Sequence, residues 1–274
     1  MKISKSKLLS FITCPEKYYL GYELKIRPVK ISSDFLIGLS THHLITSYFI
    51  RKRAGEQCDV MDLLRQYWSR YNLDNTDFMT MEELEAGMLQ SLEFAKLFLR
   101  ETNLEPSEVE SKFSLPVVNI QTGEIIPDLE LTGRIDLIDS IDGKRRVIEI
   151  KTRAKRADGF SAQMSLELTC YAYWLRFLDD QEMVPVSYIN IVKNRKPYLQ
   201  WQNQERSTED FVELFHTIKT VTENITDNRF YKNPGVHCNW CDYRPICGKD
   251  SETVKERFGQ GTFEDLREQG LIKV

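Results

Sequence analysis

The chain has 274 residues, enough for one large domain or two small ones with a substantial buried core. Its net charge of −4 argues against a protein covered in basic patches, although basic residues cluster locally at 151–156 and 193–196. No apolar run approaches a membrane-spanning length, and the N-terminus lacks the apolar segment and cleavage site of a secretory signal. We therefore expect a cytoplasmic protein with no membrane partner.

The N-terminal part of the chain shows helical periodicity. Serines near the start can cap a helix, which Pro15 interrupts before aromatic residues resume the pattern. Residues 34–52 form a further amphipathic helix that contains Gly38, a residue tolerated there if another element packs closely against it. His42 and His43 follow that glycine, and a histidine on a helix face is, taken alone, more often a core or surface residue than a metal ligand.

The middle of the chain changes from helical to strand periodicity. Two charged amphipathic helices, at 59–72 and 78–103, carry no chemistry that we can name and indicate a helical insert at about 55–105. From Glu108 the apolar period becomes two, which predicts a central sheet in a core at about 106–225. Strands are expected at 108–118, 123–139, 144–152, 184–193 and 197–204, with helices at 161–178 and from 207 to about 224. We interpret the whole chain, 1–274, as a single α/β domain.

The most informative stretch is a predicted hairpin at 131–153. Asp142 and Gly143 are a strong signal for a two-residue turn, and apolar residues alternate on both sides of them. Such a turn places Asp136 opposite Glu149, and Lys151 one side chain further along the same face. The alternate residues point to the other, buried face: Ile135, Leu137, Ile148 and Ile150.

These apposed acidic residues indicate a metal site. Two neighbouring carboxylates repel each other, and a divalent cation between them removes the repulsion. Lys151 would then lie where an attacking water or a phosphate oxygen could be bound. Two acids and a lysine on one sheet face are typical of a metal-dependent site that cleaves phosphodiesters. The alternative is a surface hairpin that carries solvated charges.

The six cysteines are unlike a disulfide framework if the protein is intracellular. Three of them crowd the C-terminal segment: Cys238, Cys241 and Cys247. A site with four thiolates needs one more ligand, and Cys14 is the best candidate because Pro15 follows it at a turn. Cys170 lies in an apolar helical pattern and Cys58 in a polar stretch, so neither is expected to bind metal. Four thiolates suit either a tetrahedral zinc ion or an iron–sulfur cluster, and the spacing alone slightly favours zinc. Because His237 is adjacent to Cys238, a zinc site with mixed ligands is a further possibility.

Together these motifs resemble the RecB-like branch of the PD-(D/E)xK nuclease superfamily, and within it the iron–sulfur members. That branch includes the CRISPR adaptation nucleases and the nuclease domains of bacterial helicase–nuclease complexes. The matching motifs are S-x-S-x-L-x-x-F-x-x-C-P-x-x-Y at 4–18, G-x-x-x-H at 38–42, G-x-(I/V)-D at 133–136, E-x-K at 149–151 and C-x2-C-x5-C at 238–247. The resemblance spans nearly the whole chain, and the motifs occur in the family's order.

The resemblance implies a restriction-endonuclease-like fold, with a mixed central sheet flanked by helices and a helical insert. It also implies that a [4Fe–4S] cluster joins the N- and C-terminal segments through Cys14 and the three C-terminal cysteines. Its role would be structural, because it would close a loop of more than two hundred residues. Mg²⁺ or Mn²⁺ would be held by His42, Asp136, Glu149 and the Ile150 carbonyl, and Lys151 would orient the water or stabilise developing charge.

Two departures from the family pattern affect the expected substrate contacts. Glu167 precedes Tyr171 by four residues, where the family often has Gln, and Gln163 lies one turn earlier as an alternative. Ile135 stands where the named motif has proline, although the metal-binding carboxylate of Asp136 remains. We expect Arg153 to contact the nucleic-acid backbone and aromatic residues such as Tyr171 to stack on bases.

The expected function is a deoxyribonuclease, most simply an exonuclease that acts on single-stranded DNA or DNA ends. By family analogy, protein partners would belong to repair, recombination or CRISPR adaptation. One competing class is a non-catalytic nucleic-acid-binding or assembly subunit that keeps the fold, but binding alone needs no apposed acids. Another is a zinc-stabilised interaction protein, which loses weight once Cys14 is counted as a ligand.

Overall fold

A computed structural model describes residues 1–179 and 181–272. Contacts divide the chain into two compact units, each of which combines segments that are far apart in the sequence. Unit 1 comprises Met1–Lys5 and Ser32–His216, and unit 2 comprises Ser6–Ile31 and Thr217–Val274. The single domain expected over 1–274 stays a prediction beside this division. Within the described residues, no helix is both long enough and apolar enough to cross a membrane.

Unit 1 is built around the mixed sheet that the sequence predicted. Its strands are β1 (Lys2–Ser4), β2 (Glu108–Val118), β3 (Ile125–Ile141), β4 (Lys144–Arg153), β5 (Val184–Val192) and β6 (Tyr198–Arg206). They are ordered β1-β3-β4-β5-β6, and β2 pairs with β3 off this path. β1 with β3 and β4 with β5 are parallel, whereas the other pairs are antiparallel.

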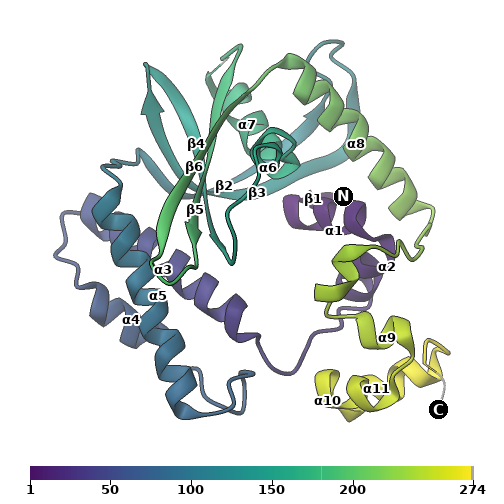
Figure 1. The fold of residues 1–274 in the computed structure, drawn as a ribbon. Coiled ribbons are helices and arrows are strands. Elements are labelled where there is room, and N and C mark those ends of the chain that lie inside the picture. Colours follow the sequence, from purple (N-terminus) through teal and green to yellow (C-terminus); the bar gives the residue numbers. More distant parts are fainter. Residues whose placement is uncertain (180, 273–274) are drawn as a thin grey trace. The chain divides into compact units, whose positions relative to one another are not determined.

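Helices flank this sheet (Figure 1). The helices of unit 1 are α3 (Ser33–Arg53), α4 (Val60–Trp68), α5 (Met81–Glu101), α6 (Phe160–Gln163) and α7 (Leu166–Asp179). Two more helices, α1 (Lys5–Thr13) and α8 (Thr208–Thr226), have residues in both units. α4 and α5 occupy the stretch predicted as a helical insert and pack with α3; that they form an insert stays a prediction. The N-termini of α4 and α5 are capped by Asp59 and Thr80, whose side chains accept hydrogen bonds from backbone N–H groups of the first helical turn. α7 packs on β3, β4 and β5.

The predicted hairpin is confirmed as β3 and β4. Asp142 and Gly143 form the turn with φ values of 50° and 76°, the left-handed conformation that such a turn requires. The predicted register holds from the pair next to the turn to the pair Leu137 and Ile148. The four residues expected on the buried face are all buried: Ile135, Leu137, Ile148 and Ile150.

Gly38 allows α3 to approach β4. A Cβ atom at this position would lie 2.9 Å from Thr152 Oγ1, closer than such contacts allow. The close packing that the sequence indicated at Gly38 is therefore confirmed. His42 lies one turn further along α3, so the same approach brings its side chain towards the sheet.

Unit 2 has a core of its own. Its elements are α2 (Pro15–Tyr18), a π-helix η1 (Tyr19–Glu23), a short 3-10 helix η2 (Val236–Trp240), α9 (Arg244–Gly248), α10 (Ser251–Phe258) and α11 (Gln260–Glu268). Leu20 and Phe258 belong to a buried apolar cluster that the N- and C-terminal segments form together. Tyr243 joins these segments directly, because its hydroxyl donates a hydrogen bond of 3.0 Å to the Ile26 carbonyl.

Candidate active site

Asp136 lies on β3 directly before Leu137, the last residue that pairs with β4 in the turn-determined register. Its Oδ2 atom accepts a hydrogen bond of 2.8 Å from the Ile150 N–H, and its Oδ1 atom lies 2.8 Å from His42 Nε2. Burial alone would raise the pKa of Asp136, but His42 and the Ile150 N–H hold it below its usual value. The carboxylate is therefore charged and aimed at the imidazole that α3 supplies.

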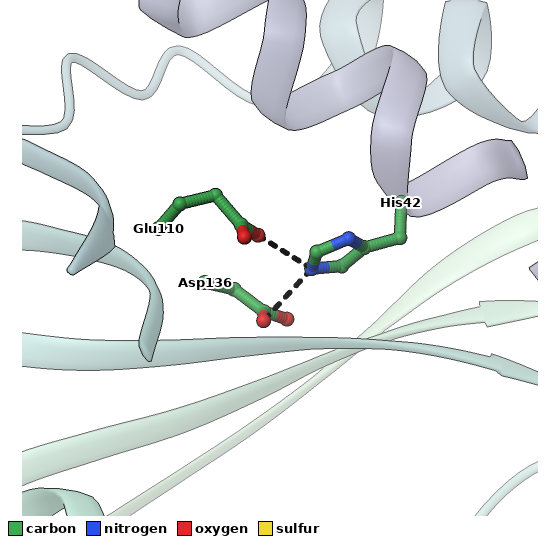
Figure 2. A group of neighbouring side chains, drawn as sticks. All are labelled: His42, Glu110 and Asp136. Carbon is green, nitrogen blue, oxygen red and sulfur yellow. Dashed lines mark ion pairs between the residues drawn. The ribbon is translucent and has the colours of Figure 1, made fainter. Parts of the chain in front are cut away.

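A third ligand-type side chain, Glu110 of β2, completes this group (Figure 2). Val109 pairs with Leu137 and Ser111 pairs with Ile135, so Glu110 lies opposite Asp136. Its Oε1 atom is 3.3 Å from His42 Nε2. One ligand atom from each of the three side chains lies within 4.8 Å of the others, which is close enough for one bound cation. Glu110 has a φ of 55°, a conformation that is uncommon outside glycine and is often found at functional sites.

Glu149 and Lys151 of β4 lie beside this group. Lys151 Nζ donates a hydrogen bond of 2.6 Å to Glu149 Oε1. Burial raises the pKa of Glu149 well above its ordinary range, and the nearby Asp136 carboxylate raises it further. The Asp136 carboxylate therefore repels the Glu149 carboxylate, as expected for two neighbouring acids. This repulsion contributes to the raised pKa of Glu149.

Two buried oxygen atoms indicate that a cation fits here. Glu149 Oε2 and Glu110 Oε1 are buried and have no hydrogen-bond partner among the described residues. Leaving a buried acceptor unpaired costs about 1–3 kcal/mol, which a bound ion would offset. Carboxylate oxygens with one imidazole nitrogen are a suitable ligand set for Mg²⁺ or Mn²⁺. His43 does not join the group, because its ring stacks on Tyr67 with centroids 4.7 Å apart.

Glu167 of α7 bridges two lysines above β4. Its Oε2 atom lies 2.9 Å from Lys151 Nζ, and its Oε1 atom forms an ion pair with Lys5. Tyr188 OH donates a further hydrogen bond of 2.8 Å to Oε2. Although burial opposes ionisation, Lys151 and Lys5 lower the pKa of Glu167 to about 2. Burial also opposes the charge of Lys151, yet Glu149 and Glu167 raise its pKa above the ordinary value.

Comparison with known proteins shows the family of the chain. A sequence model of the PD-(D/E)XK nuclease superfamily matches residues 2–248. The chain belongs to the PD-(D/E)XK nuclease superfamily. It is also 24% identical over 207 residues to one subunit of an ATP-dependent helicase/deoxyribonuclease from Clostridium botulinum, a match that covers 63% of this chain and 17% of that protein.

One solved structure that the chain matches is that of a protein from Eubacterium rectale that is named as an exonuclease. It is 16% identical, with 82% of this chain and 79% of that chain covered and a TM-score of 0.49. Because the TM-score is below 0.5, this likeness carries no weight for function.

Two residues of this PD-(D/E)XK site escaped the sequence interpretation. Glu110 is placed by the pairing of β2 with β3, and Lys5 by the parallel pairing of β1 with β3. Lys5 Nζ also lies 4.0 Å from Glu149 Oε1. No motif of the family that we matched contains either residue as a site residue. The sequence signals were an acidic residue near the start of the strand that begins at Glu108 and a basic residue directly after the first strand.

The tentative substrate residues have different environments. Gln163 is exposed, and Arg153 donates a hydrogen bond of 2.5 Å to Asn190 Oδ1. Glu167 is occupied by the two lysines and so acts on Lys151 rather than on a phosphate. The expectation that Tyr171 stacks on a base needs correction, because its ring is only 1% exposed. That ring instead lies 5.3 Å from Lys5 Nζ and helps to fix this lysine.

The four cysteines predicted to bind a cluster all belong to unit 2, but they do not form a compact metal group. Cys14 is buried and the other three are half-buried: Cys238, Cys241 and Cys247. Burial raises the pKa values of Cys241 and Cys247, and the nearby Cys14 raises both further. In the part of the chain that the structure describes, no three of these sulfur atoms lie within 4.8 Å of one another. Cys58 and Cys170 belong to unit 1.

Proposed function

We propose that the chain is a divalent-metal-dependent deoxyribonuclease that hydrolyses phosphodiester bonds as an exonuclease on single-stranded DNA or DNA ends. The observation that carries the proposal is the unpaired, buried Glu149 Oε2 beside Asp136 and Lys151. A protein that only binds nucleic acid gains nothing from burying two carboxylates together, whereas a metal-dependent nuclease needs them. The non-catalytic subunit therefore remains the second candidate and not the first.

His42, Glu110, Asp136 and Glu149 would hold Mg²⁺ or Mn²⁺, with the Ile150 carbonyl as a further oxygen ligand. The metal would lower the pKa of a bound water and balance negative charge on the phosphate. The protein's own contribution is to fix the remaining groups. Lys151 is held by Glu149 and Glu167, so its ammonium group is already positioned to contact a phosphate oxygen or to orient the water.

The choice of DNA is supported by relatedness, and the exonuclease mode follows the resemblance to the RecB-like branch. The clostridial relative is by its name part of a deoxyribonuclease, and this chain covers 17% of that protein. By the same reasoning, partners in repair, recombination or CRISPR adaptation are part of the proposal. The order of the site motifs in this chain matches that of the RecB-like branch.

We further propose that Cys14, Cys238, Cys241 and Cys247 hold a [4Fe–4S] cluster. A single tetrahedral zinc with Zn–S bonds of about 2.3 Å keeps its sulfur ligands about 3.8 Å apart. In a cubane each cysteine binds a different iron, so the four sulfur atoms stand further apart. The proposal rests on the cysteine motif and on the one compact unit that contains all four cysteines, which supports a role for the cluster in joining the two segments.

The function is tested with paired thermal-shift and nuclease assays. Asp136→Asn should abolish metal-dependent DNA cleavage, and its melting temperature should no longer rise when Mn²⁺ is added. Lys151→Ala should lower cleavage by about a hundredfold to a thousandfold yet keep the Mn²⁺-induced rise, because it removes a positioned charge and no metal ligand. Asp142→Asn, in the turn of the same hairpin, is the matched control and should retain both properties. Undiminished cleavage by the Asp136 variant would rule out this site, and wild-type protein that binds DNA without cleaving it would favour the non-catalytic subunit.

A further inference from the structure

The short helix α6 and the residue after it present two large apolar side chains to solvent. Phe160 is 69% exposed and Met164 is 76% exposed. The Met164 N–H donates a hydrogen bond of 2.9 Å to the Phe160 carbonyl, so the two residues lie one turn apart on the same side. Single exposed apolar residues are common, whereas contiguous exposed apolar surface marks interaction sites, so this adjacent pair is a candidate for one.

Buried polar contacts hold this pair in place. Arg206 is 2% exposed, and its Nη2 atom donates a hydrogen bond of 2.6 Å to the Ala162 carbonyl on α6. Its Nε atom donates another, of 2.8 Å, to Thr169 Oγ1 on α7. Burying a guanidinium group is expensive unless it is fully bonded, and burial lowers its pKa here. The chain therefore fixes a one-turn helix firmly, although its two largest apolar side chains remain exposed.

The segment that leads into α6 is basic. Lys155 and Arg156 are exposed, and Arg153 precedes them. The one acidic residue of this loop, Asp158, is already engaged, because its Oδ1 atom accepts a hydrogen bond of 2.8 Å from the Ser161 N–H. Positive charge that continues into exposed apolar side chains suits a ligand with a charged backbone and flat apolar faces.

A continuous chain of hydrogen bonds connects α6 to the candidate active site. Ser165, directly after Met164, has its Oγ atom 2.6 Å from Tyr188 OH. Tyr188 OH donates a hydrogen bond of 2.8 Å to Glu167, whose carboxylate holds Lys151. The exposed pair is therefore fixed to the same framework that positions the proposed catalytic lysine.

We propose that residues 153–164 form a binding surface for single-stranded nucleic acid, which deepens the proposed function and rests on it. The basic side chains contact backbone phosphates, and Phe160 and Met164 receive the faces of unpaired bases. A duplex keeps its base faces stacked inside, so this surface selects strands that are already single. It takes the stacking role that the buried ring of Tyr171 cannot have.

The experiment compares the binding of two oligonucleotides to metal-free protein, one with bases and one with the same backbone but abasic. Stacking is worth about 1–3 kcal/mol per base, so wild type should bind the normal strand about tenfold more tightly. The double variant Phe160→Ala with Met164→Ala should bind both strands equally. The control variant Met79→Ala with Met81→Ala removes exposed apolar side chains elsewhere in unit 1 and should keep the preference.

The charged part of the surface has a separate readout. Replacing Lys155 and Arg156 by alanine should reduce the slope of log Kd against log salt by about 1.4, at about 0.7 per phosphate contact, for either strand. A double variant at Phe160 and Met164 that retains the full preference for bases would overturn the proposal. The proposal would also be overturned if the variant with alanine at Phe160 and Met164 bound strands as wild type does but no longer bound a protein partner. If wild type shows the preference but cleaves no strand under any metal, the surface stands and the proposed nuclease activity fails.

Discussion

Replacing Glu167 by glutamine tests whether the two-lysine network is as strong as its geometry indicates. The Glu167 carboxylate accepts hydrogen bonds from Lys151 and Tyr188 and forms an ion pair with Lys5. These contacts lower its pKa to about 2 from the ordinary 4.5. At about 1.4 kcal/mol per pH unit, this difference corresponds to about 3 kcal/mol that favours the folded state when Glu167 is ionised. Glutamine keeps the shape and loses the charge, so Glu167→Gln should lower the free energy of unfolding at pH 7 by about 3 kcal/mol.

The pH dependence gives this prediction its sign. Because the folded-state pKa of Glu167 is depressed, its contribution is complete above about pH 4.5 and is lost as the pH falls towards about 2. The stability gap between wild type and Glu167→Gln should therefore close over that window. Urea unfolding of metal-free protein at pH 7 and across the acidic range measures the gap. Glu85→Gln, at an exposed position of α5, is the control. A gap that does not change with pH would refute the electrostatic reasoning.

The remaining predictions concern the metal groups. His42→Ala should weaken Mn²⁺ binding and cleavage at least tenfold, whereas His43→Ala should have a milder effect, because only His42 faces the acidic residues. Calorimetry and a nuclease assay measure the two effects, and equal losses would contradict this geometry. Glu110→Gln should weaken Mn²⁺ affinity and lower the free energy of unfolding of metal-free protein by about 1 kcal/mol, because it removes the ion pairs of Glu110 with His42 and the exposed Arg134 but keeps a hydrogen-bond acceptor. Cys14→Ala should remove the iron and the visible absorbance of anaerobically purified protein, and the control Cys58→Ala should leave both unchanged. A colourless wild-type protein that contains stoichiometric zinc would refute the cluster.

The part of the site that the sequence predicted is the part that a local rule determines. Asp142 and Gly143 permit one tight turn, and that turn fixes the β3–β4 register as far as Leu137 and Ile148. A register shift of one residue would have placed Asp136 and Glu149 on opposite faces of the sheet, so the predicted neighbouring carboxylates depend on this turn. The alternation of buried isoleucine and leucine residues followed from the same rule and is confirmed.

The residues that were missed are placed by pairings that no local rule determines. Glu110 reaches His42 through the pairing of β2 with β3, which joins strands across a loop and shifts register near Pro116. Lys5 depends on the parallel pairing of Ser4 with Thr132, residues that are far apart in the sequence. A strand periodicity of two shows which side of a strand a residue faces, but it does not show which strand becomes its neighbour.

Lys5 also explains why a glutamate is tolerated where related nucleases often have glutamine. Considered on its own, Glu167 would repel a phosphate, and from the sequence its role was in doubt. In the folded chain Lys5 and Lys151 both contact it, and both also approach Glu149. Two ammonium groups then share two carboxylates, so the added negative charge is balanced before any substrate binds. If a metal takes over Glu149, Glu167 still holds Lys151 in place, and Lys5 leaves enough positive charge at the site to accept a phosphate.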